Sequence, residues 1–306
     1  LLGGGSAAGL QARYAATDLA PEHRRGRALS VVVWATTVGA VVGPNIAGPA
    51  GAFADSIGVE PLAGPFLVGA VVMAVGAVVV LAGLRPDPLV LSRTLGPGPS
   101  GQRRRGVLRA GWSAISSSPR ALLGLASVVV AHTVMVSVMV MTPVHMSHGG
   151  ASISIIGFVI SVHVAGMYAF SPVMGWLVDR VGRVPMIVAG VVILLAAVAL
   201  AGTAAEGHSA TLTAGLFLLG LGWSAGMVAG STLLTDAVEV ADRPAAQGAS
   251  DLLMGLAAAA GGAVAGVVVG TYGYGPLNAG AAVLLAGLVV MTSIPACRPR
   301  SNTRSA

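Results

Sequence analysis

The chain has 306 residues, of which 55% are hydrophobic and 9% are charged, and its mean hydropathy is +0.85. Soluble domains carry about 25% charged residues, so this composition excludes an ordinary soluble globule and predicts an all-α, polytopic membrane protein. The formal net charge of +6 does not indicate nucleic-acid binding, because the basic residues are confined to a few loops between apolar segments.

Long apolar runs follow one another along the whole chain. Runs of about 20 apolar residues predict membrane-spanning helices. About nine are expected, counting the first, at residues 1–18, 29–53, 62–84, 121–143, 153–177, 184–203, 210–235, 250–271 and 275–296. The chain starts Leu-Leu-Gly rather than with Met, and this start resembles the inside of a span. We therefore expect a fragment that lacks its beginning.

The loops between the runs differ in their arginine content. Every basic residue is an arginine, and all of them except Arg13 lie in alternate loops, namely 21–27, 85–120, 180–183, 236–249 and 297–306. The intervening loops near 54–61, 144–152, 204–209 and 272–275 contain none. Basic loops remain in the cytoplasm by the positive-inside rule. The pattern predicts a multi-pass protein of the bacterial inner (plasma) membrane, with its basic loops and C-terminus in the cytoplasm.

The stretch 85–120 is rich in Pro, Gly, Ser and Arg, which is typical of a linker rather than a domain. Its triplet Arg103–Arg105 precedes Trp112 and Ile115, so one interpretation places this stretch against anionic lipid headgroups. The alternative is a solvated basic connector.

A charged turn separates two of the apolar runs. Residues 175–183 read Gly-Trp-Leu-Val-Asp-Arg-Val-Gly-Arg. This pattern resembles the signature loop of the major facilitator superfamily, the twelve-helix secondary transporters, in which it joins the second and third helices of each six-helix half. The resemblance implies a loop and gating set of Gly175, Asp179, Arg180, Gly182 and Arg183, with Asp236 as an acidic partner.

The resemblance also divides the chain, because the linker falls where such transporters join their two halves. It implies a major facilitator fold that lacks roughly its first three helices. Residues 1–84 would then be the remainder of the N-terminal helix bundle (helices four to six), 85–120 a cytoplasmic linker, 121–296 the C-terminal six-helix bundle, and 297–306 a cytoplasmic tail.

Two contacts are expected at the signature loop. We expect Asp179 to face the N-terminus of the helix that begins near Arg27–Leu29, where the helix dipole favours negative charge. The resemblance implies that Arg183 pairs with Asp236. Such contacts would latch the two halves together on the cytoplasmic side. The alternative is an exposed loop with a surface ion pair of little value.

A second pattern lies in the run 29–53, which reads Gly-Ala-Val-Val-Gly-Pro-Asn-Ile-Ala-Gly from residue 39. It resembles the fifth-helix motif of drug:proton antiporters, except that Ala47 replaces a glycine. Proline kinks a helix and small residues allow close helix packing. The motif residues are Gly39, Gly43, Pro44 and Gly48. The alternative is ordinary packing of small residues.

Ionisable residues within membrane spans are functional candidates. His132 and His163 lie near the middle of their spans and could carry a coupling proton, because histidine titrates near physiological pH. The alternative is a neutral histidine that is hydrogen-bonded to a neighbouring helix. Asp251 is expected about one turn into its helix, either as a coupling carboxylate or as an acid that interacts with the helix dipole.

Methionine and aromatic side chains suggest the wall of a substrate cavity for varied apolar compounds. The candidates, chosen largely by helix position, are Trp34, Asn45, Met135, Met139, Met167, Tyr168 and Trp223. The alternative for the methionines is packing or contact with lipid.

Other chemistry is not indicated. His145 and His148 have a metal-ligand spacing, but no carboxylate or cysteine accompanies them, and the single Cys297 excludes a thiolate cluster. The absence of lysine excludes a phosphate-binding loop that ends in Gly-Lys-Ser/Thr. We expect no cofactor, no metal and no enzyme activity.

The expected function is secondary active transport by alternating access, with proton-coupled export of a small hydrophobic or amphiphilic compound. The alternatives are a proton-linked importer of a small metabolite, or a truncated membrane fragment without transport activity. The expected partners are the small-molecule substrate, protons and the lipid bilayer, and we expect a monomer that does not bind nucleic acid.

Overall fold

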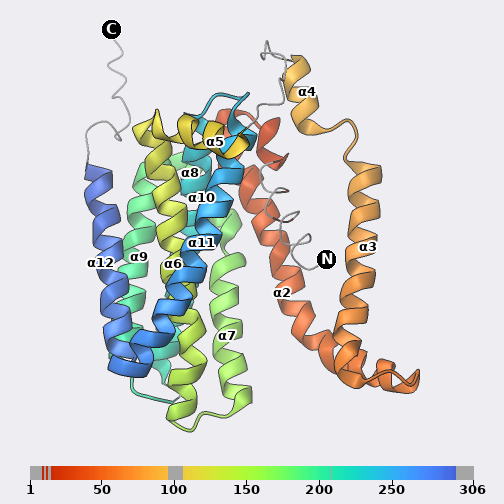
Figure 1. Cartoon of the computed structure of the whole chain (residues 1–306), viewed down its shortest axis with the longest axis vertical. Coiled ribbons are helices and arrows are strands. Elements are labelled where there is room, and N and C mark those ends of the chain that lie inside the picture. Colours follow the sequence, from red (N-terminus) through yellow and green to blue (C-terminus); the bar gives the residue numbers. More distant parts are fainter. Residues whose placement is uncertain (1–8, 10–11, 13–14, 96–105, 208, 294–306) are drawn as a thin grey trace.

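The computed structural model describes residue 9, residue 12 and residues 15–95, 106–207 and 209–293. All regular elements in these ranges are helices, and the longer ones run roughly side by side (Figure 1). The α-helices are α2 (Arg25–Ser56), α3 (Gly64–Gly83), α4 (Pro88–Leu95), α5 (Val107–Ser116), α6 (Pro119–His148), α7 (Ile153–Tyr168), α8 (Ser171–Val181), α9 (Arg183–Thr203), α10 (Ala210–Ala237), α11 (Arg243–Tyr272) and α12 (Tyr274–Ser293).

Within the described residues, seven segments are long and apolar enough to cross a membrane. They are α3, α6, α9, α10, α11, α12 and the pair α7–α8, which counts as one span from Ile155 to Val181. The expected span 29–53 forms the 32-residue helix α2, which is not among the seven. The expected span 1–18 lies largely outside the described residues. The count of nine spans therefore stays a prediction.

Helix α10 is the centre of a six-span bundle formed by α6 to α12. It packs against α6, α7 and α9, and most of its residues are buried. Small residues allow this close packing: a Cβ added at Gly124 of α6 would lie 2.8 Å from the carbonyl oxygen of Gly230. The hydroxyl of Ser127 donates a hydrogen bond of 3.0 Å to the carbonyl oxygen of Gly226. Close backbone approach and interhelical hydrogen bonds hold helices together in lipid, where no hydrophobic effect does so.

Helix α2 joins the first part of the chain to this bundle. It packs mainly against α8 and also contacts α7 and α10. Helix α3 packs against α2, and Gly64 at its start is its one buried residue. In Figure 1, α2 lies beside the bundle at the upper end of the view and diverges from it toward the lower end.

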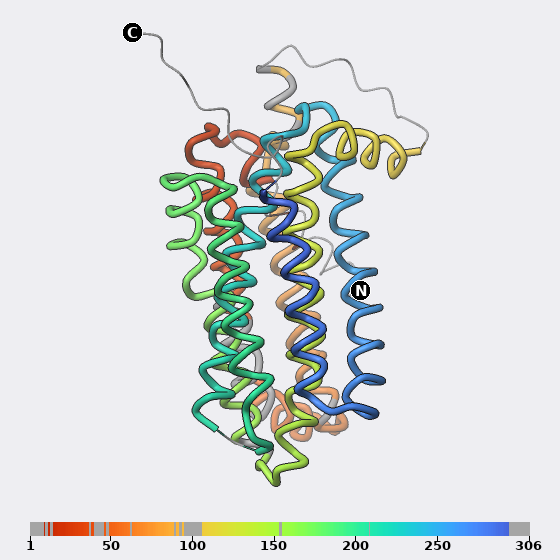
Figure 2. Tube along the Cα trace, turned by 90° about the vertical axis from the view of Figure 1, so that its left-hand side faces the viewer, coloured from red at the N-terminus to blue at the C-terminus, as the bar shows by residue number. Residues whose placement is uncertain are grey.

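The described arginine-bearing loops gather at one end of the molecule. The start of α2, the α8–α9 turn, helix α5 and the α10–α11 loop meet at the upper end in Figures 1 and 2. We call this the arginine-rich end, defined by Arg25, Arg109, Arg183 and Arg243. The clustering follows the predicted alternation of the loops, and the position of this end relative to the cell stays a prediction.

Three local features differ from the sequence-based expectation. The linker 85–120 contains two helices, and α5 packs against α11 because Gly111 lacks a side chain where it meets the backbone of Ala245. The predicted span 153–177 is broken between α7 and α8, where Pro172 in the first turn of α8 removes a backbone hydrogen bond. Helix α11 begins at Arg243 rather than near residue 250.

We predict that Gly124→Val destabilises the bundle by about 1–3 kcal/mol, because the new side chain would collide with the backbone of α10. Gly266→Val on α11 is the control, since a Cβ there meets nothing within 4 Å. The measurement is the apparent melting temperature in detergent. Equal melting temperatures for the two variants would contradict the close contact between α6 and α10.

Candidate functional site

Asp179 connects α8 to the N-terminus of α2. Its Oδ1 accepts a hydrogen bond of 3.0 Å from the backbone N–H of Gly26, and its Oδ2 accepts one of 2.9 Å from the N–H of Arg27. The first N–H groups of a helix have no partner within the helix, and the dipole favours an anion there. The contact predicted for Asp179 is therefore present, at a side chain that is only 8% exposed.

Glycines bring the two helices close enough for this contact. A Cβ added at Gly26 would lie 2.8 Å from the carbonyl oxygen of Gly175, and one added at Gly175 would meet Gly26 and the side chain of Ser30. The hydroxyl of Ser171 adds a hydrogen bond of 3.0 Å to the carbonyl oxygen of Ser30. The first glycine of the signature loop is thus required by the crossing of α2 and α8.

The second glycine of the loop has a different role. Gly182 has φ 106° and ψ 158°, a conformation that is accessible essentially to glycine alone. Gly182 caps the C-terminus of α8 and also the N-terminus of α9, so a single residue connects the two helices. This reversal places Arg183 at the first position of α9, from which its side chain reaches Asp236.

Asp236, near the end of α10, accepts hydrogen bonds from two arginines. Its Oδ2 lies 3.0 Å from Nε of Arg183, and its Oδ1 lies 2.6 Å from Nη1 of Arg25. Arg183 also donates a hydrogen bond of 2.7 Å to the carbonyl oxygen of Glu22, and its Nη2 lies 4.0 Å from Oδ1 of Asp179. The predicted Arg183–Asp236 pair is present, and the three paired side chains are 9% to 16% exposed.

The sequence-based reasoning missed Arg25, Gly26, Ser30 and Ser171. The triplet Arg25-Gly26-Arg27 at the start of an apolar run contained the available signal, since a glycine between charged residues marks a close backbone approach. Arg180 belongs to the predicted set but lies outside the ion-pair network. Its guanidinium group stacks 5.1 Å from the ring centroid of Trp176.

A cluster of three aromatic residues lies near the middle of the bundle, on three helices. The indole Nε1 of Trp223 on α10 donates a hydrogen bond of 3.0 Å to Nδ1 of His132 on α6. Tyr168 on α7 contacts Trp223 edge to face, with ring centroids 5.6 Å apart. We call His132, Tyr168 and Trp223 the midplane cluster. Because Nδ1 of His132 accepts a hydrogen bond, the neutral ring carries its proton on Nε2.

His163 is fully buried where α7 crosses α10. Its Nδ1 lies 2.8 Å from the carbonyl oxygen of Leu216, so Nδ1 carries the proton and donates. Its Nε2 has no hydrogen-bond partner among the described residues. This geometry matches the alternative of a histidine that is hydrogen-bonded to a neighbouring helix.

The remaining candidates are not brought together at one site. Met135 and Met167 are 3% and 6% exposed and pack in the core of the bundle, while Trp34 on α2 is 45% exposed. Met139 is partly buried against the same core. Asp251 is the ninth residue of α11, so it lies outside the first turn, to which the dipole effect is confined.

The fifth-helix motif lies within α2, which is continuous through Pro44. A Cβ added at Gly39 meets nothing within 4 Å, so no close helix contact occurs there. The surroundings of Gly43, Pro44, Asn45 and Gly48 are not among the features that the structure describes. The roles predicted for these residues therefore stay predictions.

The amino-acid sequence of the chain was compared with known families and proteins. The family model of the Major Facilitator Superfamily matches residues 1–150 and 125–305. The chain belongs to the major facilitator superfamily. Two uncharacterized MFS-type transporters of Bacillus subtilis, YddS and YdeG, are each 40% identical to it, over 93% and 96% of this chain and 65% and 67% of their own lengths. The riboflavin transporter RfnT of Brucella anthropi is 31% identical over 79% of this chain and 57% of its own length.

The chain thus spans about two thirds of the length of each of the two Bacillus subtilis relatives. The match covers the signature loop, whose residues form the contacts described above.

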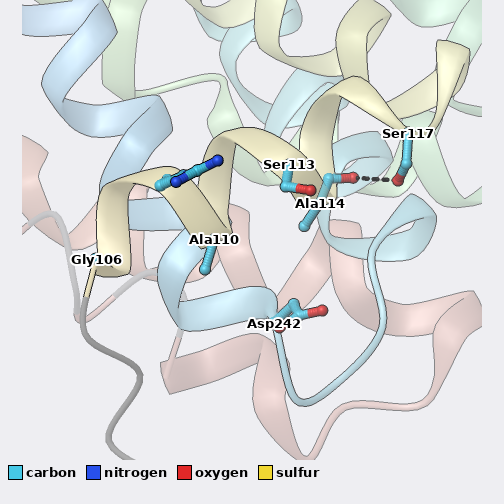
Figure 3. A pocket seen from close by; sticks show the side chains of 7 residues that line it. Gly106, Ala110, Ser113, Ala114, Ser117 and Asp242 are labelled. Carbon is cyan, nitrogen blue, oxygen red and sulfur yellow. Dashed lines mark hydrogen bonds between the residues drawn. The ribbon is translucent and has the colours of Figure 1, made fainter.

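A polar pocket of about 470 Å³ lies at the arginine-rich end of the protein (Figure 3). Arg109 and Ser113 of α5 line it, together with Ser117 just after α5 and Asp242 from the α10–α11 loop. The hydroxyl of Ser117 donates to the carbonyl oxygen of Ala114. The pocket lies outside the helices of the spans, so it does not correspond to the substrate cavity that the sequence predicts within them.

We predict that Arg183→Gln lowers the stability of this superfamily member by about 2–3 kcal/mol, because Asp236 keeps only Arg25 and the carbonyl group of Glu22 loses a charged donor. Arg180→Gln is the matched control in the same loop and should cost less than about 1 kcal/mol. Thermal unfolding in detergent measures both. A larger loss for Arg180→Gln would contradict the assigned contacts.

Proposed function

We propose that the chain is part of a secondary active transporter that works by alternating access and exports a small hydrophobic or amphiphilic compound in exchange for protons. Membership of the superfamily supports membrane transport. The observation that carries the mechanism is the set of contacts between α2 and the six-span bundle at the arginine-rich end, formed by Asp179, Asp236 and their partners.

These contacts have the properties of a gate. They are few and polar, and they lie at one end, while α2 diverges from the bundle toward the other end (Figure 1). In alternating access, two helix bundles rock around a site near the middle of the membrane. A state that is closed at the arginine-rich end keeps the Asp179 and Arg25 contacts, and the opposite state breaks them.

The proposed orientation follows the arginines. Basic loops stay in the cytoplasm, so the closed end faces the cytoplasm. The site would then be accessible from outside in this conformation, which is the state in which an exporter releases its substrate and takes up a proton.

The midplane cluster is the proposed substrate contact. Its aromatic rings come from three helices of one half and combine apolar surface with hydrogen-bonding groups, as small-molecule sites do. The name of the Brucella anthropi relative, a riboflavin transporter, favours a planar aromatic substrate.

His132 offers a route from protonation to substrate release. Its neutral ring accepts the hydrogen bond of Trp223 at Nδ1. A protonated imidazole has donors on both nitrogens and cannot accept that bond. Proton uptake at His132 would therefore release Trp223 and rearrange the surface on which the substrate rests.

We predict that inverted membrane vesicles containing the protein accumulate an added lipophilic cationic dye when they are energised, and that a protonophore abolishes the accumulation.

Asp179→Asn should slow the accumulation of dye roughly tenfold, because a loss of about 1.4 kcal/mol from one of two states changes their ratio tenfold. Asp55→Asn, at the exposed opposite end of α2, is the matched control. Accumulation that persists with the protonophore would refute proton-coupled export, and efflux from inverted vesicles would favour the importer.

We predict that Trp223→Phe weakens the apparent affinity for the transported compound about fivefold, because an aromatic ring remains but loses the hydrogen bond to His132 that holds it in place, a loss of about 1 kcal/mol. Trp176→Phe on α8, which lies outside the midplane cluster, should leave the affinity unchanged. Concentration dependence of transport measures both variants. Unchanged affinity for Trp223→Phe would remove the midplane cluster from the substrate site.

A further inference from the structure

A crevice of about 220 Å³ lies between α6, α11 and α12. It contains no charged side chain. Its lining consists of small and apolar residues of the three helices, with the hydroxyl-bearing Thr133 and Ser137 among them.

Small residues on two helices create this space. Gly261 and Ala265 of α11 face Gly280 and Ala281 of α12 across it, and α6 forms its floor. At Gly261, α11 lies close against α6, since an added Cβ would lie 2.7 Å from Cγ2 of Thr133. At Gly280 the space is open, since an added Cβ meets nothing within 4 Å.

The crevice opens on the outer surface of the helices rather than into the bundle. Val264 and Leu284 line it and are 59% and 49% exposed. The nearby Val267 and Val283 are also exposed. All three helices are candidate membrane spans. The crevice is therefore reached from the hydrocarbon layer, and its apolar lining does not hold water.

One polar group in this crevice lacks a partner. The hydroxyl of Thr133 donates a hydrogen bond of 2.8 Å to the carbonyl oxygen of Val129, the usual arrangement for a hydroxyl in a membrane helix. Ser137, one turn further along α6, makes no such bond to any described residue, although it is only 7% exposed. The hydroxyl of Ser137 lines the crevice with its hydrogen-bonding capacity unused, so a ligand atom that pairs with it is favoured.

We propose that this crevice binds a small apolar molecule that enters from the bilayer and carries one hydroxyl or carbonyl group, which hydrogen-bonds to Ser137. The volume supports this size, because an apolar cavity of about 150 Å³ accommodates a benzene ring. The site is independent of the proposed export cycle, since none of its lining residues belongs to the gate or to the midplane cluster.

The test uses the whole chain in proteoliposomes and a benzyl alcohol that carries a photoactivatable diazirine on its ring. After irradiation, mass spectrometry of the peptides locates the adducts and gives the concentration for half-saturation. The expected result is saturable labelling of residues 276–284 and 261–268. Labelling that rises linearly with concentration, without saturation, would overturn the proposal.

Two matched pairs of variants test the site itself. Gly280→Leu fills the open space and should abolish saturable labelling, whereas Gly287→Leu, seven residues further along the same helix and equally uncrowded, should not. Ser137→Ala should raise the half-saturation concentration about fivefold, the loss of one hydrogen bond. Thr133→Val should leave it unchanged, because that hydroxyl is already bonded within α6.

Two outcomes of these variants would overturn the proposal. One is equal loss of labelling in Gly280→Leu and Gly287→Leu, since the crevice would then not be the site. The other is unchanged half-saturation in Ser137→Ala. A phospholipid with a diazirine at the end of its acyl chain provides the last comparison: if it labels the same residues and the benzyl alcohol does not displace it, the occupant is a lipid tail and the proposal is wrong.

Discussion

The first N–H groups of α2 have no acceptor within the helix. Their need for acceptors is the constraint on which the packing of α2 against the bundle depends. A helix that begins at the surface of a membrane must find acceptors for its first N–H groups. Asp179 supplies both of its oxygens to Gly26 and Arg27. The contact is possible only because Gly26 and Gly175 lack side chains, so the close crossing of α2 and α8 and the capping of α2 are one feature.

Much of this end of the molecule could be predicted from the sequence. Alternate loops carry the arginines, and alternate loops lie at the same end of the spans, so the sequence indicated which loops gather at one end of the molecule. The helix dipole indicated the partner of Asp179, and the resemblance of the signature loop to that of the superfamily implied the partner of Arg183. Arg25 was not predicted as a second partner of Asp236, because a pair between residues 211 positions apart leaves no local signal in one sequence.

The interior of the bundle was less predictable. Hydrophobic periodicity locates a span but does not fix its rotation, and the rotation decides which neighbour a mid-span side chain meets. His132 and His163 looked equivalent in the sequence, yet one accepts a hydrogen bond from an indole and the other donates one to a backbone carbonyl group. Helix α5 was missed because the glycines and serines around it are typical of a linker, whereas its packing depends on α11.

The shared position of Asp236 has an energetic consequence for a moving protein. Arg183 and Asp236 both belong to the six-span bundle, whereas Arg25 belongs to α2. In the proposed cycle, in which α2 separates from the bundle, the carboxylate of Asp236 would lose Arg25 and keep Arg183, so it would not be left as an isolated charge, which would be costly in a poorly solvated place. On that proposal, Arg183 is a permanent counterion of Asp236 that would keep the two end states close in free energy and allow repeated passage between them.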